Sequence, residues 1–424
     1  MNTTRRSFLK SAALGAAGAP LLLESCNSHT EQAGFAPVAS YSSLDDAISS
    51  PVLKKELFPD PVIIDRLELL RYEDNFICRI TSTDGAEGLS VANNEQMASL
   101  YPIFVNRLQP FFPGKDARQW EALLEEIYVY QSNYKLQNLA LWVPLATIEF
   151  AVLDMLGKIA KKSMGELIGE IRHPRVAVYQ ANNFRGKSAA ESIGLIKRQV
   201  ARSGARAVKI KVGGRMSQNR DYPPGRTEEL VPMVRKTFGD DMILYADSNG
   251  SYDVSEAIRI GKLLEEYQYE FFEEPVPFDW YEETRQVNEA LSIPIAGGEQ
   301  EPSMQNFRSL IGNSALDVVQ PDLFYFGGMI RSMKVARMAA FMGKACTPHI
   351  SGSGLGYLYM MHFVSALPNA GPFHEFKGFN KYIPLDGPAS SMSSFNGMVV
   401  VPTGPGLGMT IDPEFVAKHQ PVEG

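Results

Sequence analysis

The chain has 424 residues, of which 45% are hydrophobic and 21% charged, a balance that excludes a wholly disordered protein. Its net charge of −7 argues against a protein that binds nucleic acid without regard to sequence. Three cysteines, Cys26, Cys78 and Cys346, are too few for a disulfide framework, and we expect Cys78 and Cys346 to stay unjoined.

The first 26 residues have the features of an export signal. Arg5-Arg6-Ser7-Phe8-Leu9-Lys10 is a twin-arginine pattern ahead of a short, weakly apolar stretch, which is typical of the Tat route. Leu23-Glu24-Ser25-Cys26 has the layout of a lipoprotein cleavage site with an atypical Glu24, so lipidation of Cys26 stays open. Residues 27–52 predict a tether, and we expect the protein in the periplasm or at the cell envelope. Beyond this leader we find no apolar run long enough to span a membrane.

Residues 53–170 predict a small α+β domain. Two β-like runs, 63–72 and 76–82, are separated by a short turn. Helical patterns follow over 94–108, 117–130 and 144–159. In the last of these, apolar residues recur at i, i+3, i+4 and i+7, which indicates a helix that faces the core.

From Val176 onward, short apolar runs alternate with helical segments. There are eight such runs: VAVYQ, ARAVKIKV, MILYAD, YEFFEE, IPIAGGE, LDVVQPD, KACTPH and PFHEF. Eight strand–helix alternations predict a (β/α)8 barrel, in which the active site lies at the carboxyl ends of the strands.

Carboxylates close three consecutive runs at a constant interval. Asp247, Glu273 and Glu299 are each 26 residues apart, about the length of one strand–helix unit, so all three should meet at one end of the barrel. Converging carboxylates need a positive charge to coexist, and oxygen ligands favour a hard cation, most commonly Mg²⁺. The spacing therefore predicts a metal site; the alternative is three unrelated solvated carboxylates.

Two pairs of residues supply candidate bases. Lys209 and Lys211 share one face of a strand, where each should lower the pKa of the other and make a lysine a competent general base. His349 and Asp322 follow adjacent strands, and a carboxylate bonded to one imidazole nitrogen would orient the ring. His374 is a weaker candidate. Bases on both sides of a metal suit removal of a proton α to a carboxylate.

These motifs, in this order, resemble the mandelate racemase subgroup of the enolase superfamily. The resemblance covers residues 60–412 and implies a modified TIM barrel, (β/α)7β, over 171–384. It implies an N-terminal α+β capping domain over 53–170, to which the segment 385–424 returns. The matching motifs are Lys209-Ile-Lys211, Asp247-Ser-Asn249, Phe272-Glu273-Glu274-Pro275, Gly297-Gly298-Glu299, Gln320-Pro321-Asp322 and Pro348-His349.

The resemblance implies a role for each matching residue. Asp247, Glu273 and Glu299 would bind Mg²⁺, and Lys211 and His349 would be the two bases. The remaining roles are orientation of His349 by Asp322, contact with the substrate carboxylate by Lys209, a hydrogen bond to the enolate from Glu375, and a substrate contact at Asn249.

The implied reaction is Mg²⁺-dependent removal of the α-proton with stabilisation of the enolate. We expect dehydration of a sugar acid, an aldonate or aldarate, to a 2-keto-3-deoxy acid, with His349 as the acid. The alternative is a racemase or epimerase of a 2-hydroxy acid; a lysine on the sixth strand, as in muconate cycloisomerases and dipeptide epimerases, is absent from 322–326. The intact bases disfavour a noncatalytic sugar-acid binding protein, and the lack of His-x-His in the first strand disfavours a metal-dependent hydrolase.

Three loops are candidates for specificity. Capping-domain loops are expected around 85–94 and 130–139, and the Tyr, Asn and Gln of the second suit a hydroxylated substrate. The polar loop 213–226 either brings Arg215 and Arg226 to an anionic substrate or is a solvated surface loop. We also expect a small-molecule carboxylate as the binding partner, and a homo-oligomer.

Overall fold

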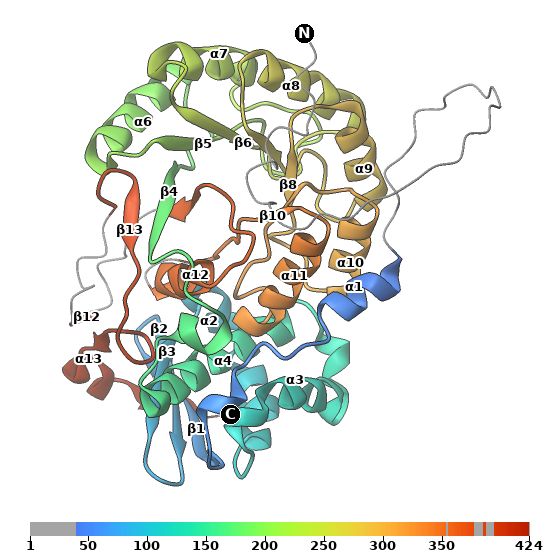
Figure 1. Cartoon of the computed structure of the whole chain (residues 1–424). Coiled ribbons are helices and arrows are strands. Elements are labelled where there is room, and N and C mark those ends of the chain that lie inside the picture. The colour runs from blue at the N-terminus through green and yellow to red at the C-terminus, as the bar shows by residue number, and fades with distance from the viewer. Residues whose placement is uncertain (1–39, 353–354, 377–384, 387–393, 424) are drawn as a thin grey trace, which may run out of the picture.

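The computed structural model describes residues 40–352, 355–376, 385–386 and 394–423. The predicted Tat signal over 1–26 and the open question of Cys26 lie outside these residues. The described chain forms an α/β barrel and a smaller part built on an antiparallel sheet, as Figure 1 shows. This is the predicted fold class, a TIM-like barrel with an N-terminal capping domain.

The capping domain is an antiparallel sheet covered by helices. Its sheet has the order β15-β1-β2-β3, with Leu69 of β1 opposite Cys78 of β2. The strands are β1 (Ile64–Tyr72), β2 (Asn75–Ser82), β3 (Glu87–Val91) and β15 (Gln420–Pro421). The helices are α2 (Asn94–Ile103), α3 (Trp120–Val129), α4 (Leu139–Ala160) and α5 (Met164–Ile168), and a π-helical segment, Phe104–Leu108, continues α2.

Helix α4 is the core helix of this domain. It begins at Leu139, five residues before the predicted start, because the Asn138 side chain accepts a hydrogen bond from the Leu139 amide at 2.8 Å and Pro144 is tolerated inside the helix. Among the described residues it is the one helix that is long and apolar enough to cross a membrane, a stretch that we had not expected. Every residue from 141 to 157 is buried, so the protein's own core covers this helix.

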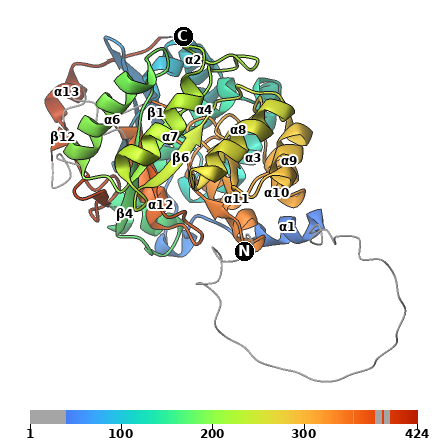
Figure 2. The same ribbon diagram turned by 90° about the horizontal axis from the view of Figure 1, so that it is seen from above.

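In the described part of the barrel, eight parallel strands alternate with seven helices, which confirms the (β/α)7β pattern that the resemblance implies. The sheet runs β10-β9-β8-β7-β6-β5-β4-β11, and a parallel bridge links Cys346 of β10 to Ala370, in the segment that leads into β11. The strands are β4 (Arg175–Ala181), β5 (Ala207–Lys211), β6 (Ile243–Asp247), β7 (Phe271–Glu273), β8 (Ile295–Gly297), β9 (Val318–Val319), β10 (Ala345–Cys346) and β11 (His374–Phe376). The helices are α6 (Ala189–Ser203), α7 (Arg226–Phe238), α8 (Val254–Glu266), α9 (Tyr281–Ala290), α10 (Met304–Gly312), α11 (Met329–Phe341) and α12 (Leu355–Ser365), and they follow one another around the outside of the strands (Figures 1 and 2).

Aromatic rings fill the barrel interior below the strand ends. Tyr245 stacks on Phe271 with centroids 3.9 Å apart, and Tyr179 meets Tyr245 edge-on at 5.4 Å. The ammonium of Lys209 lies 5.2 Å above the Tyr179 ring. Because residues two apart share a strand face, Asp247 follows Tyr245 on the inside, and the charged groups form a layer above this aromatic floor.

The C-terminal segment crosses both parts of the molecule. Strand β13 (Met398–Val400) pairs with β4 of the barrel, and β12 (Leu385–Asp386) pairs with β14 (Thr410–Ile411). Helix α13 (Pro413–Ala417) follows, and β15 then pairs with β1. The predicted return to the capping domain is therefore made by the last strand, whereas β13 extends the barrel sheet.

Residues 40–58 form a strap between the two parts, although most of them were predicted as tether. Helix α1 (Tyr41–Ala47) lies beside α10 and α11 in both views (Figures 1 and 2), with the Leu44 side chain fully buried. Arg308 bonds Asp45 at 2.6 Å, and further along the chain the Val52 amide donates to Glu121 of α3 at 2.7 Å. A few apolar side chains thus dock a segment whose average composition suggested a free linker.

Candidate active site

Three buried carboxylates meet at the carboxyl ends of the central strands. Asp247 and Glu273 end β6 and β7 in register, and Glu299 lies two residues beyond β8. One oxygen from each of the three lies within 4.8 Å of the others. The convergence predicted from the 26-residue spacing is confirmed, and an all-oxygen donor set of this kind fits a hard divalent cation.

The two lysines of β5 bind different members of this triad. The buried Lys209 ammonium donates to both oxygens of Glu273, at 2.9 and 2.7 Å. Lys211 donates to Asp247 and, at 3.2 Å, to Oδ1 of Asn249. Burial lowers the pKa of Lys209, but the surrounding carboxylates, Glu273 above all, raise it well above its ordinary value. The net lowering of the Lys209 pKa that we expected for the lysine pair is therefore wrong, because the surrounding carboxylates dominate.

Neighbouring charges shift the pKa values of the triad carboxylates in opposite directions. Burial raises the pKa of Asp247, but Lys211, Lys209 and Arg185 outweigh it and hold that pKa below its ordinary value. Burial and the negative charge of Asp247 together raise the pKa of Glu273 to about 7, although Lys209 opposes them. Gln320, which carried no predicted role, donates to Glu273 at 3.1 Å. This excess of negative charge around Glu273 is a second reason why a cation fits the triad.

His349 and Asp322 form the predicted dyad on the other side. His349 Nδ1 donates to Asp322 at 2.7 Å, which leaves Nε2 facing Glu299 at 3.4 Å and Glu375 at 3.6 Å. The backbone amides of Phe324 and Tyr325 both donate to Asp322 at 2.8 Å. Burial lowers the pKa of His349, but the negative charge of Glu299, the hydrogen bond to Asp322 and the charge of Glu375 raise it to about 9.

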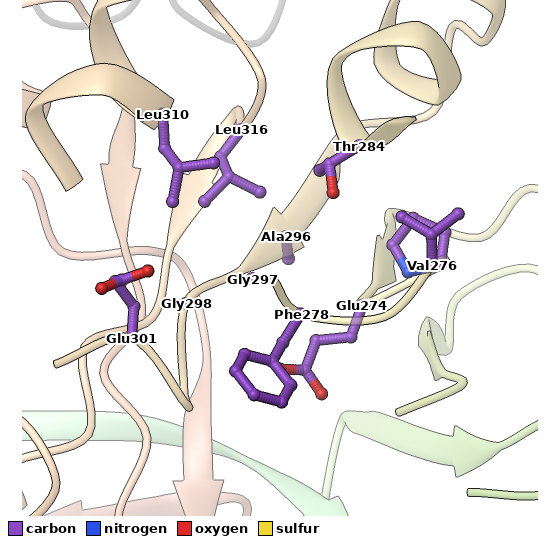
Figure 3. A pocket seen from close by; sticks show the side chains of 11 residues that line it. Glu274, Val276, Phe278, Thr284, Ala296, Gly297, Gly298, Glu301, Leu310 and Leu316 are labelled. Carbon is purple, nitrogen blue, oxygen red and sulfur yellow. The ribbon is translucent and has the colours of Figure 1, made fainter. Parts of the chain in front are cut away.

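Asn249 and Arg185 complete the Lys211 side of the site. Asn249 is buried; its Oδ1 accepts from Lys211 and, at 2.8 Å, from Arg185, and its Nδ2 donates to Glu274 at 3.2 Å. Figure 3 shows Glu274 at a small cavity that is lined by Phe278 among others and by none of the triad carboxylates. Arg185 lies in the loop after β4 and had no role in the sequence analysis, since no spacing or motif marks it.

The other candidates have structural roles. Arg226 is buried and donates to backbone oxygens that include Lys211 O at 2.8 Å, so it fits neither alternative for loop 213–226, whereas Arg215 is exposed. His374 faces Gly371 O at 3.0 Å, and burial lowers its pKa to about 3. A residue of the predicted capping loop 85–94 does reach the dyad: Asn93 donates to Ser351 at 2.9 Å, and Ser351 donates to Asp322 at 3.1 Å.

The described contacts of the loop predicted at 130–139 are made within the capping domain. Its residues 130–136 are helical turns interrupted by a kink at Gln131 and Ser132, whose φ angles are 47° and 60°. Asn133 is buried there, accepts from Arg107 at 2.8 Å and donates to Ile127 O at 2.9 Å. Its role in specificity stays a prediction.

Comparison with known proteins identifies the family. A sequence profile described as "Enolase C-terminal domain-like" matches residues 192–415, more than half of the chain. The arabinonate dehydratase of Saccharolobus solfataricus is 28% identical over 313 residues, which are 72% of this chain and 79% of that protein. The D-galactarolactone cycloisomerase of Agrobacterium fabrum is 27% identical over 316 residues, 72% of this chain and 81% of that protein.

A solved structure agrees with this match. The mandelate racemase/muconate lactonizing protein from Paracoccus denitrificans, complexed with magnesium, superposes with a TM-score of 0.77 at 26% sequence identity. The superposition covers 85% of this chain and 99% of that chain. The chain therefore belongs to the enolase superfamily, in its mandelate racemase and muconate lactonizing group, and is an enzyme of the lyase or isomerase class.

Proposed function

We propose that this enzyme removes the proton α to the carboxylate of a sugar acid and expels the β-hydroxyl group, giving a 2-keto-3-deoxy acid. One observation carries the proposal: the two bases lie at opposite ends of the carboxylate triad. Lys211 is bonded to Asp247 at one end, and His349 faces Glu299 at 3.4 Å at the other. A substrate bound over the triad would have one base on each face of its α-carbon.

Asp247, Glu273 and Glu299 would hold Mg²⁺, which suits their all-oxygen donor set. When bound, the ion supplies positive charge that stabilises the enolate. Lys209, kept protonated by its two bonds to Glu273, adds a fixed positive charge beside the substrate carboxylate.

The two bases divide the proton transfers. Lys211 takes the α-proton, and the electron pair of that C–H bond moves into the enolate of the substrate carboxylate. The same pair then forms the Cα–Cβ double bond of the enol as the β C–O bond breaks. The His349 imidazolium protonates the departing oxygen so that it leaves as water. Asp322 holds the imidazole with Nε2 toward the reacting atoms. The enol then tautomerises to the 2-keto acid.

The choice of substrate class rests on the relatives. Those reported above include an arabinonate dehydratase and a D-galactarolactone cycloisomerase, both named for acids or lactones of sugars. Racemisation is the second candidate, because the same two-sided arrangement of bases would let one remove the proton and the other return it.

A substrate screen tests the proposal. The protein is incubated with Mg²⁺ and a panel of aldonic and aldaric acids, and 2-keto-3-deoxy products are detected as semicarbazones. We expect at least one acid to be dehydrated, with a loss of about a hundredfold or more in Lys211→Ala and in His349→Asn. His362→Asn is the control and should keep activity, because His362 is a buried histidine of α12 that bonds Leu407 O.

Two outcomes would contradict the dehydratase. Inversion at C2 without loss of water would establish the racemase instead. An acid that binds but exchanges no α-hydrogen in D2O would leave only a noncatalytic binding protein.

We further propose that the enzyme is exported by the Tat route, on the strength of Arg5-Arg6 and the stretch that follows them. Replacement of both arginines by lysine should retain the protein in the cytoplasmic fraction of a Tat-competent host. Export of that variant at the wild-type level would contradict the assignment.

A further inference from the structure

Arg185 makes four hydrogen bonds at the Lys211 side of the site. Its Nε donates to Gly213 O at 3.1 Å, and one terminal nitrogen donates to Asn249 Oδ1 at 2.8 Å. The other terminal nitrogen donates to Val212 O at 3.3 Å and to Asp247 O at 3.1 Å. A guanidinium has five N–H groups, so at most one remains for any other partner. Arg185 is therefore poorly suited to bind the substrate itself.

The partners of Arg185 lie on the two strands that carry Lys211 and Asp247. Val212 and Gly213 directly follow Lys211 at the end of β5, and Asp247 ends β6. The guanidinium thus joins the ends of both strands through their carbonyl groups. A planar group with fixed donor directions is well suited to hold such ends in one arrangement.

Asn249 links Arg185 to the base. Its Oδ1 accepts from both Arg185 and the Lys211 ammonium, at 2.8 and 3.2 Å. The backbone of Asn249 has a φ of 46°, and its backbone N–H donates to Asp247 Oδ1 at 2.9 Å. Because Nδ2 donates to Glu274, the oxygen of the amide is turned toward the two cations. These contacts hold Asn249 in the left-handed region, which asparagine tolerates better than most residues, with Oδ1 between Arg185 and Lys211.

The His349 side has a separate support. Its Nδ1 bonds Asp322, which is held by the amides of Phe324 and Tyr325 and by Ser351. The four hydrogen bonds of Arg185 reach none of these groups.

We propose that Arg185 is the positioning residue of Lys211, acting through Asn249 and the two strand ends, as Asp322 positions His349. This inference rests on the proposed function, since it assigns Arg185 to one of the two proton-transfer faces. Its loss should impair proton transfer by Lys211 and leave transfer by His349 intact.

The experiment compares α-hydrogen exchange in D2O for two sugar acids that differ only in configuration at C2. Lys211→Ala and His349→Asn first show which base serves which epimer. In Arg185→Met we expect exchange of the Lys211-served epimer to fall by about a hundredfold, the scale of a misplaced catalytic group, with KM changed less than about twofold. Exchange of the His349-served epimer should stay near wild type. Arg185→Lys keeps the positive charge but loses the planar arrangement of donors, and it should show the same selective loss. This variant replaces Arg185→Met in the test if the methionine variant does not fold.

Arg235→Met is the matched control. Arg235 also donates to several backbone carbonyls, including Met242 O at 2.9 Å and Tyr267 O at 3.0 Å, but these precede β6 and β7 at the opposite end of the barrel. Its loss should lower the unfolding temperature without changing the ratio of the two exchange rates.

The inference has clear contrary outcomes. An equal fall for both epimers in the Arg185 variants, or no fall for either, would overturn it while the proposed function stands. If wild type exchanges one epimer only, the variants must lose that exchange when Lys211 serves it and keep it when His349 does. If wild type neither exchanges the α-hydrogen of any acid nor dehydrates any acid of the panel, both proposals are wrong.

Discussion

The carboxylates of the triad are chemically similar, but their neighbours make them different. Asp247 is surrounded by Lys211, Lys209 and Arg185, which hold its pKa below the ordinary value against the effect of burial. Glu273 is opposed by Asp247, so burial and that charge raise its pKa to about 7. A bound cation would lower the pKa of Glu273 again, because positive charge stabilises the ionised carboxylate. At the scale of single residues, the site is thus built to receive positive charge.

Neutral substitutions within the triad should abolish metal binding. We expect wild type to retain one Mg²⁺ per chain after dialysis against Mg²⁺ and then metal-free buffer, and Asp247→Asn and Glu299→Gln to retain none, because each loses an anionic oxygen ligand. Metal analysis of the dialysed proteins measures this. Glu301→Gln is the control: Glu301 is buried near Glu299, but it bonds Ser303 and Asn306 and lies outside the triad. A wild-type protein without stoichiometric metal would refute the assignment.

Residues whose role follows from strand spacing could be predicted, and those that depend on side-chain direction could not. The 26-residue interval placed Asp247, Glu273 and Glu299 together, since a barrel brings successive strand ends to one place. The polar sequence around Arg226 suggested that its side chain could bind an anionic substrate. In the structure this side chain points inward and donates to backbone oxygens. Arg185 has no periodic context at all, and its importance appears only when Asn249 lies beside it.

At the scale of elements, a buried carboxylate joins the two domains. Glu149 of α4 accepts from Trp120 Nε1 at 2.8 Å and from the Ile330 amide in the first turn of α11 at 3.0 Å. Burial raises its pKa to about 7, although these hydrogen bonds oppose the shift. The capping domain is therefore connected to the barrel by a group that titrates near neutral pH.

The sign of the resulting pH effect follows from linkage. The folded pKa of Glu149 lies above its ordinary value of 4.5, so between about pH 4.5 and 7 the folded protein keeps a proton that the unfolded chain releases. This contribution to stability is fully present below about pH 4.5, is lost as the pH rises to about 7, and is constant above it. The loss amounts to about 3 kcal/mol, since one pKa unit is worth roughly 1.4 kcal/mol.

Urea unfolding of wild type and Glu149→Gln between pH 5 and 8, in metal-free buffer, measures this effect. The amide presents an N–H group to one of the two donors, so the variant should be less stable at pH 5. Because the variant does not titrate, the gap in unfolding free energy should narrow as the pH rises. A gap that stays constant from pH 5 to 8 would show that Glu149 does not titrate in this range.

At the scale of the whole molecule, the barrel was predictable because its pattern repeats, and the connections between its parts were not. Eight apolar runs with helical segments between them indicate the barrel, and the family resemblance refines the eightfold pattern to (β/α)7β, as the structure has it. The pairing of β13 with β4 could not be predicted in this way, because β13 is not part of any sequence repeat. The docking of the strap over 40–58 was also missed, because it depends on a few apolar residues among many small polar ones. The average composition of the segment does not show these few residues.

The strap leads to the last prediction, which separates a free tether from a docked segment. Leu44 of α1 has an exposed fraction of 0% and packs beside Gly312 of α10, where Tyr41 also lies. Leu44→Ala should therefore lower the free energy of unfolding by about 2–5 kcal/mol, the usual cost of removing a buried leucine side chain. Val129→Ala is the control; Val129 is 63% exposed, so its loss should change little. Thermal unfolding of both variants measures the difference. If Leu44→Ala unfolds with wild type, residues 40–50 do not dock in solution, and the barrel and capping domain hold together without them.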